Sequence, residues 1–310
     1  MDEQQKLRLR QIAGPRIRFH VPMDRHTTFK AGGSAEALYR TGDPEELERV
    51  ITFLEKEGIP RLVAGRGSNL LVRDGGIRGV VILLADGVFK RIEGPGTDGE
   101  ELLAGAGVSL SDLLISCRDR GLSGLEFLAG IPGTVGGAVI MNAGAFGKET
   151  GPLVREVKTV DRSGHPSEMD ASMLRFSYRS LDLEPGTVIT QVLFHLYRDS
   201  PERISQRIAE FLRRRRETQP SGYGSAGSIF KNPPGNHAGR LIEEAGLKGR
   251  SMGGAMISDK HANFIVNLGG ATASDIISLI RLAREEVRKK SGVLLDLEIQ
   301  IVGEPQDQKV

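Results

Sequence analysis

The feature that most constrains this chain is the stretch from Gly121 to Gly147, GLSGLEFLAGIPGTVGGAVIMNAGAFG. Eight of its residues are glycine, and Glu126 is its only charged side chain. So much glycine, together with Pro132 in the middle, is incompatible with one regular helix or strand. So little charge argues against a solvated loop. We therefore expect irregular backbone that packs against an apolar interior.

Buried irregular backbone must find hydrogen-bond partners outside the ordinary helix and strand ladders. Two interpretations meet this requirement. The stretch is either a tightly packed core turn, or its glycines let the main chain approach a ligand closely, so that free N–H groups donate to phosphate or ring-carbonyl oxygens. The second interpretation predicts a cradle for a large, partly anionic cofactor.

The composition indicates a globular protein without a membrane segment. The 310 residues are enough for two domains of ordinary size, and the net charge of +2 is too small to suggest nucleic-acid binding. No run of about eighteen apolar residues predicts a transmembrane helix. The charged N-terminus also lacks the apolar segment of a secretory signal. We expect a cytoplasmic protein that does not insert into membranes.

Cysteine and histidine usage predicts no metal site. Cys117 is the only cysteine, which excludes an intramolecular disulfide and a multi-cysteine metal site. It falls in an apolar helical pattern, so we expect a packed thiol rather than a nucleophile. The histidines share no metal-ligand spacing.

A second glycine-rich loop, Gly65-Arg66-Gly67-Ser68-Asn69, lies between two strand-like segments, 59–65 and 70–72. A Rossmann fingerprint needs a helix after the glycine loop, so this order differs from it. Two interpretations stay open at this point: a plain hairpin turn, or a phosphate-binding loop of another kind.

Two further glycine patterns match dinucleotide motifs in spacing only. Residues 94–99 match G-x-G-x-x-G, but a strand pattern follows, so we interpret the match as a hairpin loop. Gly105-Ala106-Gly107 does lead into a helix with Ser109 as its N-cap. Leu110 occupies the third glycine position there, and no acidic residue follows at the required distance. We expect no Rossmann site at either place.

The best-marked helix is predicted from Pro44 to Gly58. Asp43 is its N-cap, Pro44 its first residue, and Glu46 completes a capping box. Its buried face is expected to consist of four apolar residues: Leu47, Val50, Ile51 and Leu54.

A domain boundary is predicted near residue 200, where another helix begins. Before it, the nearly continuous apolar run Val188–Leu196 predicts a central strand. After it, we expect a strand over 261–268 and a helix from Thr272 to Gly292. The helix that begins at residue 200 should bury one apolar face: Ile204, Ile208, Phe211 and Leu212.

The terminal segment 295–301 alternates between apolar and polar residues and predicts a strand. Leu295, Leu297, Ile299 and Ile301 would face the core, and Glu298 would lie on the opposite face. A carboxylate displayed on a rigid strand suits catalysis, although an exposed polar face alone would explain the same pattern.

Several separated segments resemble one family, the UDP-N-acetylenolpyruvoylglucosamine reductases of bacterial peptidoglycan precursor synthesis. They are HTTFKAGGSA (26–35), GRGSNLLV (65–72), GLEFLAGIPGTVGGAVIMNAGAFG (124–147), SAGSIFKNP (225–233) and, more weakly, Glu298 in LDLEIQIVG (295–303). The resemblance spans about residues 20 to 303 and is closest to the second, smaller subtype. One departure is that Ser180 follows Arg179 directly, whereas the family usually has one more residue between them.

The resemblance implies an α+β protein with a flavin-binding fold of the vanillyl-alcohol-oxidase (PCMH) type. Two subdomains, about 16–85 and 86–200, would form an FAD-binding domain over 16–200, and 201–310 would form an α+β substrate-binding domain. It also implies that both glycine-rich stretches bind FAD, the first at its pyrophosphate and the second beside its isoalloxazine ring. The implied cofactor-binding residues are Gly65, Arg66, Gly67, Ser68, Asn69, Ile131, Pro132, Gly133, Val135, Gly136, Gly137, Asn142, Gly144 and Ala145.

The implied reaction is the NADPH-consuming reduction of UDP-N-acetylglucosamine enolpyruvate to UDP-N-acetylmuramate. Hydride would pass from NADPH to flavin N5 and then to the vinyl carbon, so the protein must orient and polarise the reactants. Hydride addition places negative charge on the neighbouring carboxylate as an enediolate, which calls for a fixed cation and a hydrogen-bond donor. The expected small-molecule partners are therefore NADPH and the enolpyruvyl substrate, bound alternately.

The family motifs imply a role for each of three catalytic residues. Arg179 would bind the carboxylate, Glu298 would donate a hydrogen bond beside it, and Ser228 would protonate the enediolate. Without the motifs, each would be read as an ordinary surface or turn residue. The implied substrate-binding residues are Tyr178, Lys231, Asn232 and, more weakly, His261 with Asn263.

Two alternatives predict different residues. Another flavin-dependent oxidase or dehydrogenase on the same scaffold would keep the glycine cradles but lack SAGSIFKNP and the terminal glutamate. A non-catalytic nucleotide- or precursor-binding regulator would lack Arg179, Ser228 or Glu298. All of these features are present, which favours the reductase.

Overall fold

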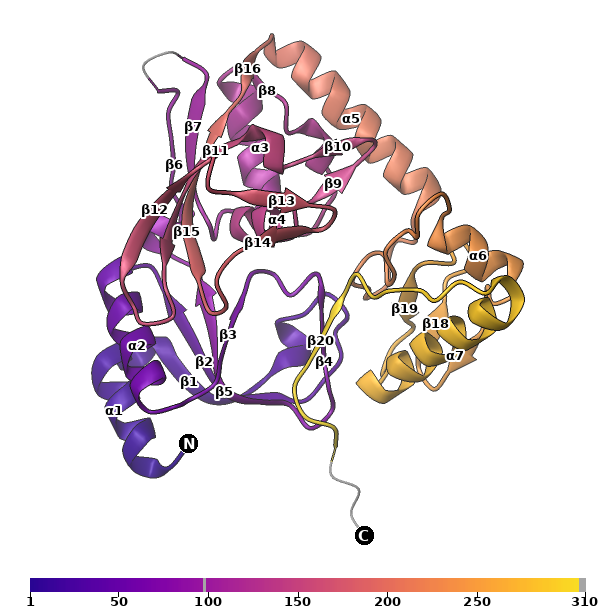
Figure 1. Ribbon diagram of the computed structural model, residues 1–310, viewed down its shortest axis with the longest axis horizontal. Coiled ribbons are helices and arrows are strands. Elements are labelled where there is room, and N and C mark those ends of the chain that lie inside the picture. Colours follow the sequence, from indigo (N-terminus) through magenta and orange to yellow (C-terminus); the bar gives the residue numbers. More distant parts are fainter. Residues whose placement is uncertain (97–98, 307–310) are drawn as a thin grey trace. The chain divides into compact units, whose positions relative to one another are not determined.

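The computed structural model describes residues 1–96 and 99–306, and the chain divides into two compact units (Figure 1). The first unit consists of Met1–Phe19, Ala37–Gly65 and Gly79–Arg213, and the second of His20–Glu36, Arg66–Arg78 and Arg214–Val310. Each unit has its own buried apolar cluster. One crossing from the first unit to the second falls inside the glycine loop 65–69, between Gly65 and Arg66.

The predicted domain limits, 16–200 and 201–310, stay a prediction. The compact units divide the C-terminal half at Arg213, within helix α5 (Pro201–Thr218). The first turns of α5 belong to the first unit because Ile204 is buried in its core. Segments 20–36 and 66–78 belong with the C-terminal residues.

A five-stranded antiparallel sheet, in the order β12-β11-β15-β7-β6, forms the centre of the first unit. Strand β15 (Val188–His195) lies between β11 (Val154–Val160) and β7 (Glu101–Gly105), which confirms the predicted central strand. The outer strands are β12 (Pro166–Asp170) and β6 (Ile92–Glu93).

A four-stranded sheet has the order β1-β2-β5-β3. Two N-terminal helices, α1 (Glu3–Ala13) and α2 (Pro44–Lys56), share its apolar cluster through side chains such as Leu9 and Leu47, which meet Tyr39 and Ile82 in that cluster. Strand β3 pairs parallel with β5. The strands are β1 (Ile17–Pro22), β2 (Ser34–Thr41), β3 (Arg61–Ala64) and β5 (Ile77–Leu84).

Helix α2 begins as predicted, but its capping box is not formed. Asp43 accepts from the backbone N–H groups of Glu45 and Glu46 at 3.0 and 3.4 Å, and the four predicted apolar residues are buried. The Glu46 carboxylate accepts instead from the Tyr39 hydroxyl at 2.5 Å, and the Asp43 N–H donates to Thr41 Oγ1. A partner from a neighbouring strand thus replaces the local one.

The two glycine patterns that match dinucleotide motifs in spacing only, 94–99 and 105–107, have the predicted surroundings: a pair of strands at the first and a following helix at the second. Strands β6 and β7 pair antiparallel across residues 94–99, of which 97 and 98 lie outside the described residues. After Gly107 comes α3 (Leu110–Asp119), whose N-cap Ser109 accepts from the Asp112 N–H at 3.1 Å. Because β7 has antiparallel neighbours on both sides, it cannot open a Rossmann βαβ unit.

The stretch 121–147 is irregular, as predicted, but it contains a short helix that the sequence did not predict. That helix, α4 (Val135–Ile140), is capped by Thr134, whose Oγ1 accepts from the Gly137 N–H at 3.4 Å. The remaining elements are brief: β8 (Leu122–Ser123), the 3₁₀ turn η4 (Glu126–Leu128) and β9 (Gly144–Ala145), followed by β10 (Lys148–Glu149).

Helix α5 buries a narrower face than the sequence predicts. Ile204 is buried, and Ile208 and Phe211 pack against the apolar cluster of the first unit. Leu212 is exposed, so its predicted burial is wrong, because it lies at the edge of the stripe set by those three residues. Further short elements of this unit are η1 (Gly14–Arg16), η3 (Gly87–Lys90), η5 (Gly151–Leu153) and β16 (Tyr197–Arg198).

An ion pair between the half-buried Arg207 and the buried Glu126 holds α5 to the glycine-rich stretch. Arg207 donates to Glu126 Oε1 through Nε at 3.0 Å and Nη2 at 2.9 Å, and Nη2 also reaches Asp199 at 2.7 Å. The Gly124 N–H donates to the other oxygen of Glu126 at 2.8 Å. Glu126 is only 3% exposed, so the single charge of the stretch is fully paired.

The second unit combines short strands with two helices, α6 (Ala238–Glu244) and α7 (Ala273–Ser291). Helix α7 has the predicted ends, a Thr272 capping box and a left-handed Gly292. Asp74 also accepts from the Ala273 and Ser274 N–H groups at 2.8 and 2.9 Å. The other elements are η2 (Met23–Arg25), β4 (Leu70–Val72), β17 (Ser251–Met252), β18 (Ala255–Ile257), β19 (Ile265–Asn267) and β20 (Gln300–Val302).

Two predicted strands of the second unit are too long. The predicted strand 261–268 is β19 alone, and the predicted strand 295–301 is reduced to β20, which pairs parallel with β4. Before β20 the strand pairing is a single antiparallel bridge between Leu297 and Phe230, in which the Glu298 N–H donates to Ile229 O and the Lys231 N–H to Asp296 O, both at 2.8 Å. The pairing does not continue into a ladder. The predicted alternation of buried residues is found in part, because Leu295 and Ile299 are buried.

Among the described residues no helix has both the length and the apolar character to span a membrane. Across that same part of the chain, no three His, Cys, Asp or Glu side chains gather as metal ligands. Cys117 is buried as predicted, and burial raises the pKa of its thiol to about 12.

We predict that Glu126→Gln destabilises the fold by about 2 kcal/mol at neutral pH, because hydrogen bonds to charged groups contribute about 1.5–3 kcal/mol. Burial raises the pKa of the Glu126 carboxyl, but the hydrogen bonds from Gly124, Arg207 and Ser123 outweigh it and hold the pKa below 4.5. The unfolded chain therefore binds more protons, so this stabilisation is present above pH 4.5 and is lost as the pH falls below it.

Urea unfolding between about pH 7 and about pH 3 tests this linkage. Wild type should lose stability more steeply than Glu126→Gln in the acid range. Glu286→Gln, which removes an exposed pair with Lys289, is the matched control and should change stability by about 0.5 kcal/mol or less. Parallel pH curves for wild type and Glu126→Gln would contradict the assignment.

Candidate functional site

The glycine loop 65–69 presents main-chain donors. None of the N–H groups of Arg66, Gly67 and Ser68 donates to a partner within residues 1–96 and 99–306. Gly67 has φ +63°, and a Cβ there would collide with the carbonyl oxygen of His26. The two flanking strands pair with different partners, β3 with β5 and β4 with β20, so the hairpin interpretation is wrong. The loop is free to bind an anion.

Asn69 joins this loop to the predicted catalytic glutamate. The Asn69 Nδ2 donates to the carbonyl oxygen of Glu298 at 3.1 Å. The main-chain carbonyl oxygen of Asn69 accepts from the Gln300 N–H at 2.9 Å. Because the Glu298 N–H donates to Ile229, the backbone of Glu298 is held between the glycine loop and the segment that carries Ser228.

The Ser228 segment is held by Asn263, which is 3% exposed. The Asn263 side chain accepts from the Phe230 N–H at 3.0 Å and donates to Phe230 O at 2.8 Å, and its carbonyl oxygen accepts from the Ile229 N–H at 2.8 Å. Ser228 is half-buried, and its hydroxyl makes no hydrogen bond within the described part of the chain. The second unit thus brings Ser228, Glu298 and the glycine loop together.

The three other predicted residues of this unit differ in what they offer. The side chain of Lys231 has no partner within the described ranges. Asn232 caps α6 by accepting from the Ala238 N–H at 3.0 Å, which leaves its amide N–H groups available. His261 accepts from the Asn263 N–H through Nδ1 at 3.2 Å, and burial lowers the pKa of its ring. A neutral His261 would therefore carry its proton on Nε2.

Arg179 and Tyr178 lie in the first unit, at the tip of a tight hairpin. Strands β13 (Arg175–Ser177) and β14 (Ser180–Asp182) pair directly from Ser177 to Ser180, so Tyr178 and Arg179 alone form the turn. Arg179 has φ +60°. Its guanidinium carbon lies 5.0 Å from the centre of the Tyr178 ring, in a cation–π contact. The missing residue of the family pattern is thus accommodated by a two-residue turn.

The stretch 131–145 fits the packed-core interpretation at some positions and the cradle interpretation at others. Val135, Gly136 and Gly137 donate their N–H groups to Val108 O, Ala106 O and Thr134 Oγ1. Val135 is fully buried, and a Cβ at Gly136 would lie 2.9 Å from that of Ala106. Pro132 and Gly137 are exposed, while Ile131, Gly133, Gly144 and Ala145 are half-buried. A ligand could contact this exposed edge, but not through the bonded amides.

Gly65 is also required by packing. A Cβ at this position would lie 2.5 Å from the hydroxyl oxygen of Thr134, the residue that caps α4. The end of β3 therefore approaches the glycine-rich stretch within the first unit. Both glycine-rich segments need glycine for reasons that the sequence pattern alone does not distinguish.

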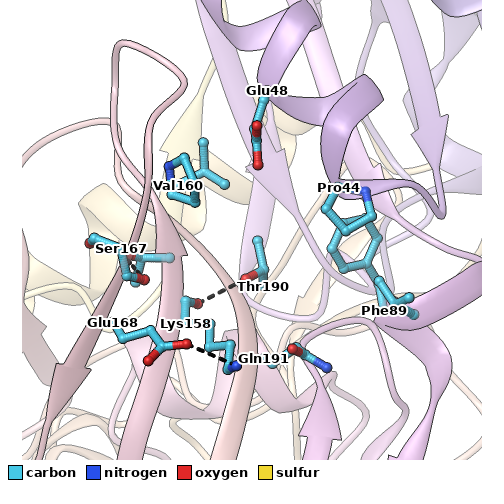
Figure 2. Close-up of a pocket in the computed structure, with 12 residues that line it drawn as sticks. Pro44, Glu48, Phe89, Lys158, Val160, Ser167, Glu168, Thr190 and Gln191 are labelled. Atoms are coloured by element: carbon cyan, nitrogen blue, oxygen red, sulfur yellow. Dashed lines mark hydrogen bonds and ion pairs between the residues drawn. The ribbon is translucent and has the colours of Figure 1, made fainter.

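A separate cavity of about 300 Å³ lies in the first unit, between α2 and strands β11, β12 and β15 (Figure 2). Its walls carry the Glu48 side chain and the Lys158–Glu168 ion pair of 2.9 Å, and Thr190 Oγ1 donates to Lys158 O at 3.0 Å. No motif in the sequence marked these residues. None of the predicted site residues lines the cavity.

Comparisons with known proteins identify the family. Residues 35–170 match the family model "FAD binding domain", and residues 219–302 match "UDP-N-acetylenolpyruvoylglucosamine reductase, C-terminal domain". The UDP-N-acetylenolpyruvoylglucosamine reductase of Geobacter metallireducens is 45% identical over 98% of this chain and 100% of its own length. The chain belongs to the UDP-N-acetylenolpyruvoylglucosamine reductase family.

Other UDP-N-acetylenolpyruvoylglucosamine reductases agree with this. The relative from Alkalilimnicola ehrlichii is 46% identical over 96% of this chain and 98% of its own length. The crystal structure of the reductase from Thermus caldophilus is 41% identical, covers 93% of this chain and 100% of its own, and superposes with a TM-score of 0.81. The predicted family and α+β fold are confirmed. The roles of the predicted site residues stay predictions.

The glycine loop provides a test of the backbone argument. We predict that Gly67→Ala destabilises the protein by about 2–5 kcal/mol, because a left-handed alanine costs about 1–2 kcal/mol and the collision with His26 adds a packing cost of about 1–3 kcal/mol. Gly246→Ala is the control, because Gly246 has φ +74° but open space around its Cβ position. Thermal unfolding should show the larger decrease for Gly67→Ala. Equal decreases would mean that the close approach to His26 is unimportant.

Proposed function

We propose that this protein is an FAD-dependent enzyme that uses NADPH to reduce UDP-N-acetylglucosamine enolpyruvate to UDP-N-acetylmuramate. The observation that carries the proposal is 45% identity to a UDP-N-acetylenolpyruvoylglucosamine reductase over nearly the whole of both chains. The matches to an FAD binding domain and to the reductase C-terminal domain support it independently. We place the reaction in the cytoplasm, in keeping with the single buried cysteine.

The glycine loop fits the pyrophosphate of FAD. The unpartnered N–H groups of Arg66, Gly67 and Ser68 form a short run of donors, and the Arg66 side chain adds a positive charge. The exposed edge at Pro132 and Gly137 would contact the flavin ring by close approach. Bound FAD would supply the hydride-transfer chemistry between NADPH and the enolpyruvyl group.

Arg179 is proposed to bind the substrate carboxylate. A guanidinium presents a rigid fork of donors that matches a carboxylate, and its charge persists at every physiological pH. The Tyr178 ring supports one face of it. As hydride addition turns the enolpyruvyl group into an enediolate, negative charge builds on the carboxylate oxygens, and a pre-placed cation stabilises it.

Glu298 is proposed to donate a hydrogen bond to the same developing charge from its protonated carboxyl group. Its backbone is fixed on both sides, by Asn69 at the carbonyl oxygen and by Ile229 at the N–H. Fixed donors lose little freedom when the transition state forms, which is the basis of their catalytic effect. The clamp also ties the position of Glu298 to that of the glycine loop.

Ser228 is proposed to deliver the proton to the carbon next to the hydride acceptor. Its hydroxyl lacks a partner within the described residues, so nothing in that part of the chain competes for the proton. A serine hydroxyl is a weak acid, and only a strongly basic species such as an enediolate can take its proton. Lys231, Asn232 and the Nε2–H of His261 are proposed to bind the UDP part.

The first test is the visible absorption spectrum of the freshly purified protein. We expect a yellow flavin spectrum, release of FAD on denaturation, bleaching by NADPH and reoxidation by the enolpyruvyl substrate. A protein that stays colourless after incubation with FAD would refute the proposal.

Ser228→Ala tests the assigned proton donor. We predict that flavin reduction by NADPH changes by less than about 3-fold, whereas reduction of the enolpyruvyl substrate slows by about 10²–10⁴-fold, the usual contribution of a general acid. Stopped-flow absorbance separates the two half-reactions. Ser251→Ala, at an exposed serine elsewhere in the second unit, is the control and should leave both nearly unchanged. Equal losses in both halves for Ser228→Ala would refute its role.

A further inference from the structure

Asn142 has an unusual place in the first unit. It follows α4, has φ +39°, and is only 1% exposed. Left-handed backbone is uncommon for residues other than glycine, and asparagine is among those that tolerate it best. The family resemblance implies that this residue contacts the cofactor.

The side chain of Asn142 makes three hydrogen bonds inside the protein. Its Nδ2 donates to the carbonyl oxygen of Ser177 and to Glu149 Oε2, both at 2.9 Å. Its Oδ1 accepts from the Gly151 N–H, also at 2.9 Å. Both amide hydrogens therefore already have acceptors. If this amide donated to a cofactor, the bond to Ser177 or the bond to Glu149 would have to break.

All three bonds lead to the surroundings of Arg179. Ser177 is the last residue of β13, directly before the Tyr178-Arg179 turn. Gly151 lies under the ring of Phe176, since a Cβ at Gly151 would come within 2.6 Å of that ring. Asn142 thus holds the hairpin at its main chain and holds the residue on which the hairpin packs.

The third bond fixes the backbone beside the guanidinium. Glu149 pairs with Gly144 across β9 and β10. A Cβ at Gly144 would lie 2.9 Å from Arg179 Nη1 and 2.8 Å from Lys148 O. Glycine at 144 therefore leaves the space in which the guanidinium lies. The bond from Asn142 to Glu149 keeps the pair of strands β9 and β10 in place.

We propose that Asn142 is a positioning residue for Arg179 rather than a cofactor ligand. By tying Ser177, Glu149 and Gly151 together, it sets the direction in which the Arg179 guanidinium meets the carboxylate of an enolpyruvyl substrate. This inference rests on the proposed function for the identity of that carboxylate. The paired hydrogen bonds between a guanidinium and a carboxylate depend on their relative orientation. Displacing the guanidinium by about 1 Å costs about 10²-fold in rate.

Asn142→Asp is the sharpest variant. Aspartate has the same shape, tolerates left-handed backbone and still accepts from Gly151, but it cannot donate to Ser177 or Glu149. We expect kcat/KM for the enolpyruvyl substrate to fall by about 10²-fold, with kcat lowered as well as KM raised, because Arg179 is proposed to bind both the substrate carboxylate and the enediolate. FAD content and the rate of flavin reduction by NADPH should stay within about 3-fold of wild type, because the proposed function assigns Arg179 to the reduction of the enolpyruvyl substrate alone.

The double variant Asn142→Asp/Glu149→Gln provides the rescue. The amide introduced at position 149 can donate to the carboxylate introduced at position 142, which restores one link with the direction of the hydrogen bond reversed. We expect the double variant to recover part of the lost kcat/KM. Equal losses of FAD content, NADPH reduction and substrate reduction in Asn142→Asp would overturn the proposal in favour of a cofactor contact. An unchanged kcat/KM would also overturn it.

Amide hydrogen exchange separates this inference from the proposed function. In the protein without added substrate, Asn142→Asp should speed exchange in peptides covering the hairpin 175–182, and the double variant should slow it again. If wild type does not reduce the enolpyruvyl substrate, the proposed function fails, while faster hairpin exchange would still support the positioning role. Unchanged hairpin exchange would overturn it whatever the activity.

Discussion

Main-chain hydrogen bonds between the glycine-rich stretch and residues 106–110 are the constraint on which the rest of the first unit depends. Leu110 donates to Gly133 O at 3.1 Å, and Val135 and Gly136 donate to Val108 O and Ala106 O at 2.9 Å. These bonds satisfy buried groups that no regular ladder reaches. They require glycine at 136 and fix the start of α4, whose far end leads to Asn142. At these positions the packed-core interpretation accounts for the glycines, and the cofactor cradle stays a proposal for the exposed edge of the stretch.

Asparagine side chains bond to main-chain groups that strand ladders do not reach. Asn69 donates to Glu298 O, Asn142 to Ser177 O and Asn263 to Phe230 O. Asn267 donates to Phe29 O at 2.9 Å and accepts from the Gly269 and Ala271 N–H groups. A primary amide offers donors and an acceptor at one site, so it can bridge main-chain segments that have no common register. The proposed catalytic residues lie next to such bridges.

Sequence patterns predicted what is decided locally and missed what is decided at a distance. The helix ends at Asp43, Ser109 and Thr272 were predictable because an N-cap bonds N–H groups two or three residues away. The capping box at Glu46 failed because Tyr39, on a neighbouring strand, binds that carboxylate instead. The strand predicted over 295–301 failed because alternating burial also fits irregular backbone.

For the candidate site, the family motifs imply catalytic roles for Arg179, Ser228 and Glu298, and these roles stay predictions. The motifs also marked Asn69, Asn142 and Asn263, but as cofactor or substrate contacts and not as residues that hold neighbouring backbone in place. The role of Asn142 depends on Ser177, which lies in another strand. A glycine needed for a left-handed turn also looks the same in a sequence as one needed for close packing. Gly67 and Gly136 could be told apart only from what surrounds each Cβ position.

The parallel pairing of β20 with β4 has a consequence for synthesis on the ribosome. Residues 20–36 and 66–78 of the second unit emerge early, yet their partners, among them α7 beside Asp74 and β20 beside β4, are the last parts of the unit to be translated. The first unit can assemble during translation, since it ends at Arg213. The apolar strand Leu70–Val72 must wait as an unpaired edge until translation is nearly complete, which is the period when it is most exposed to aggregation.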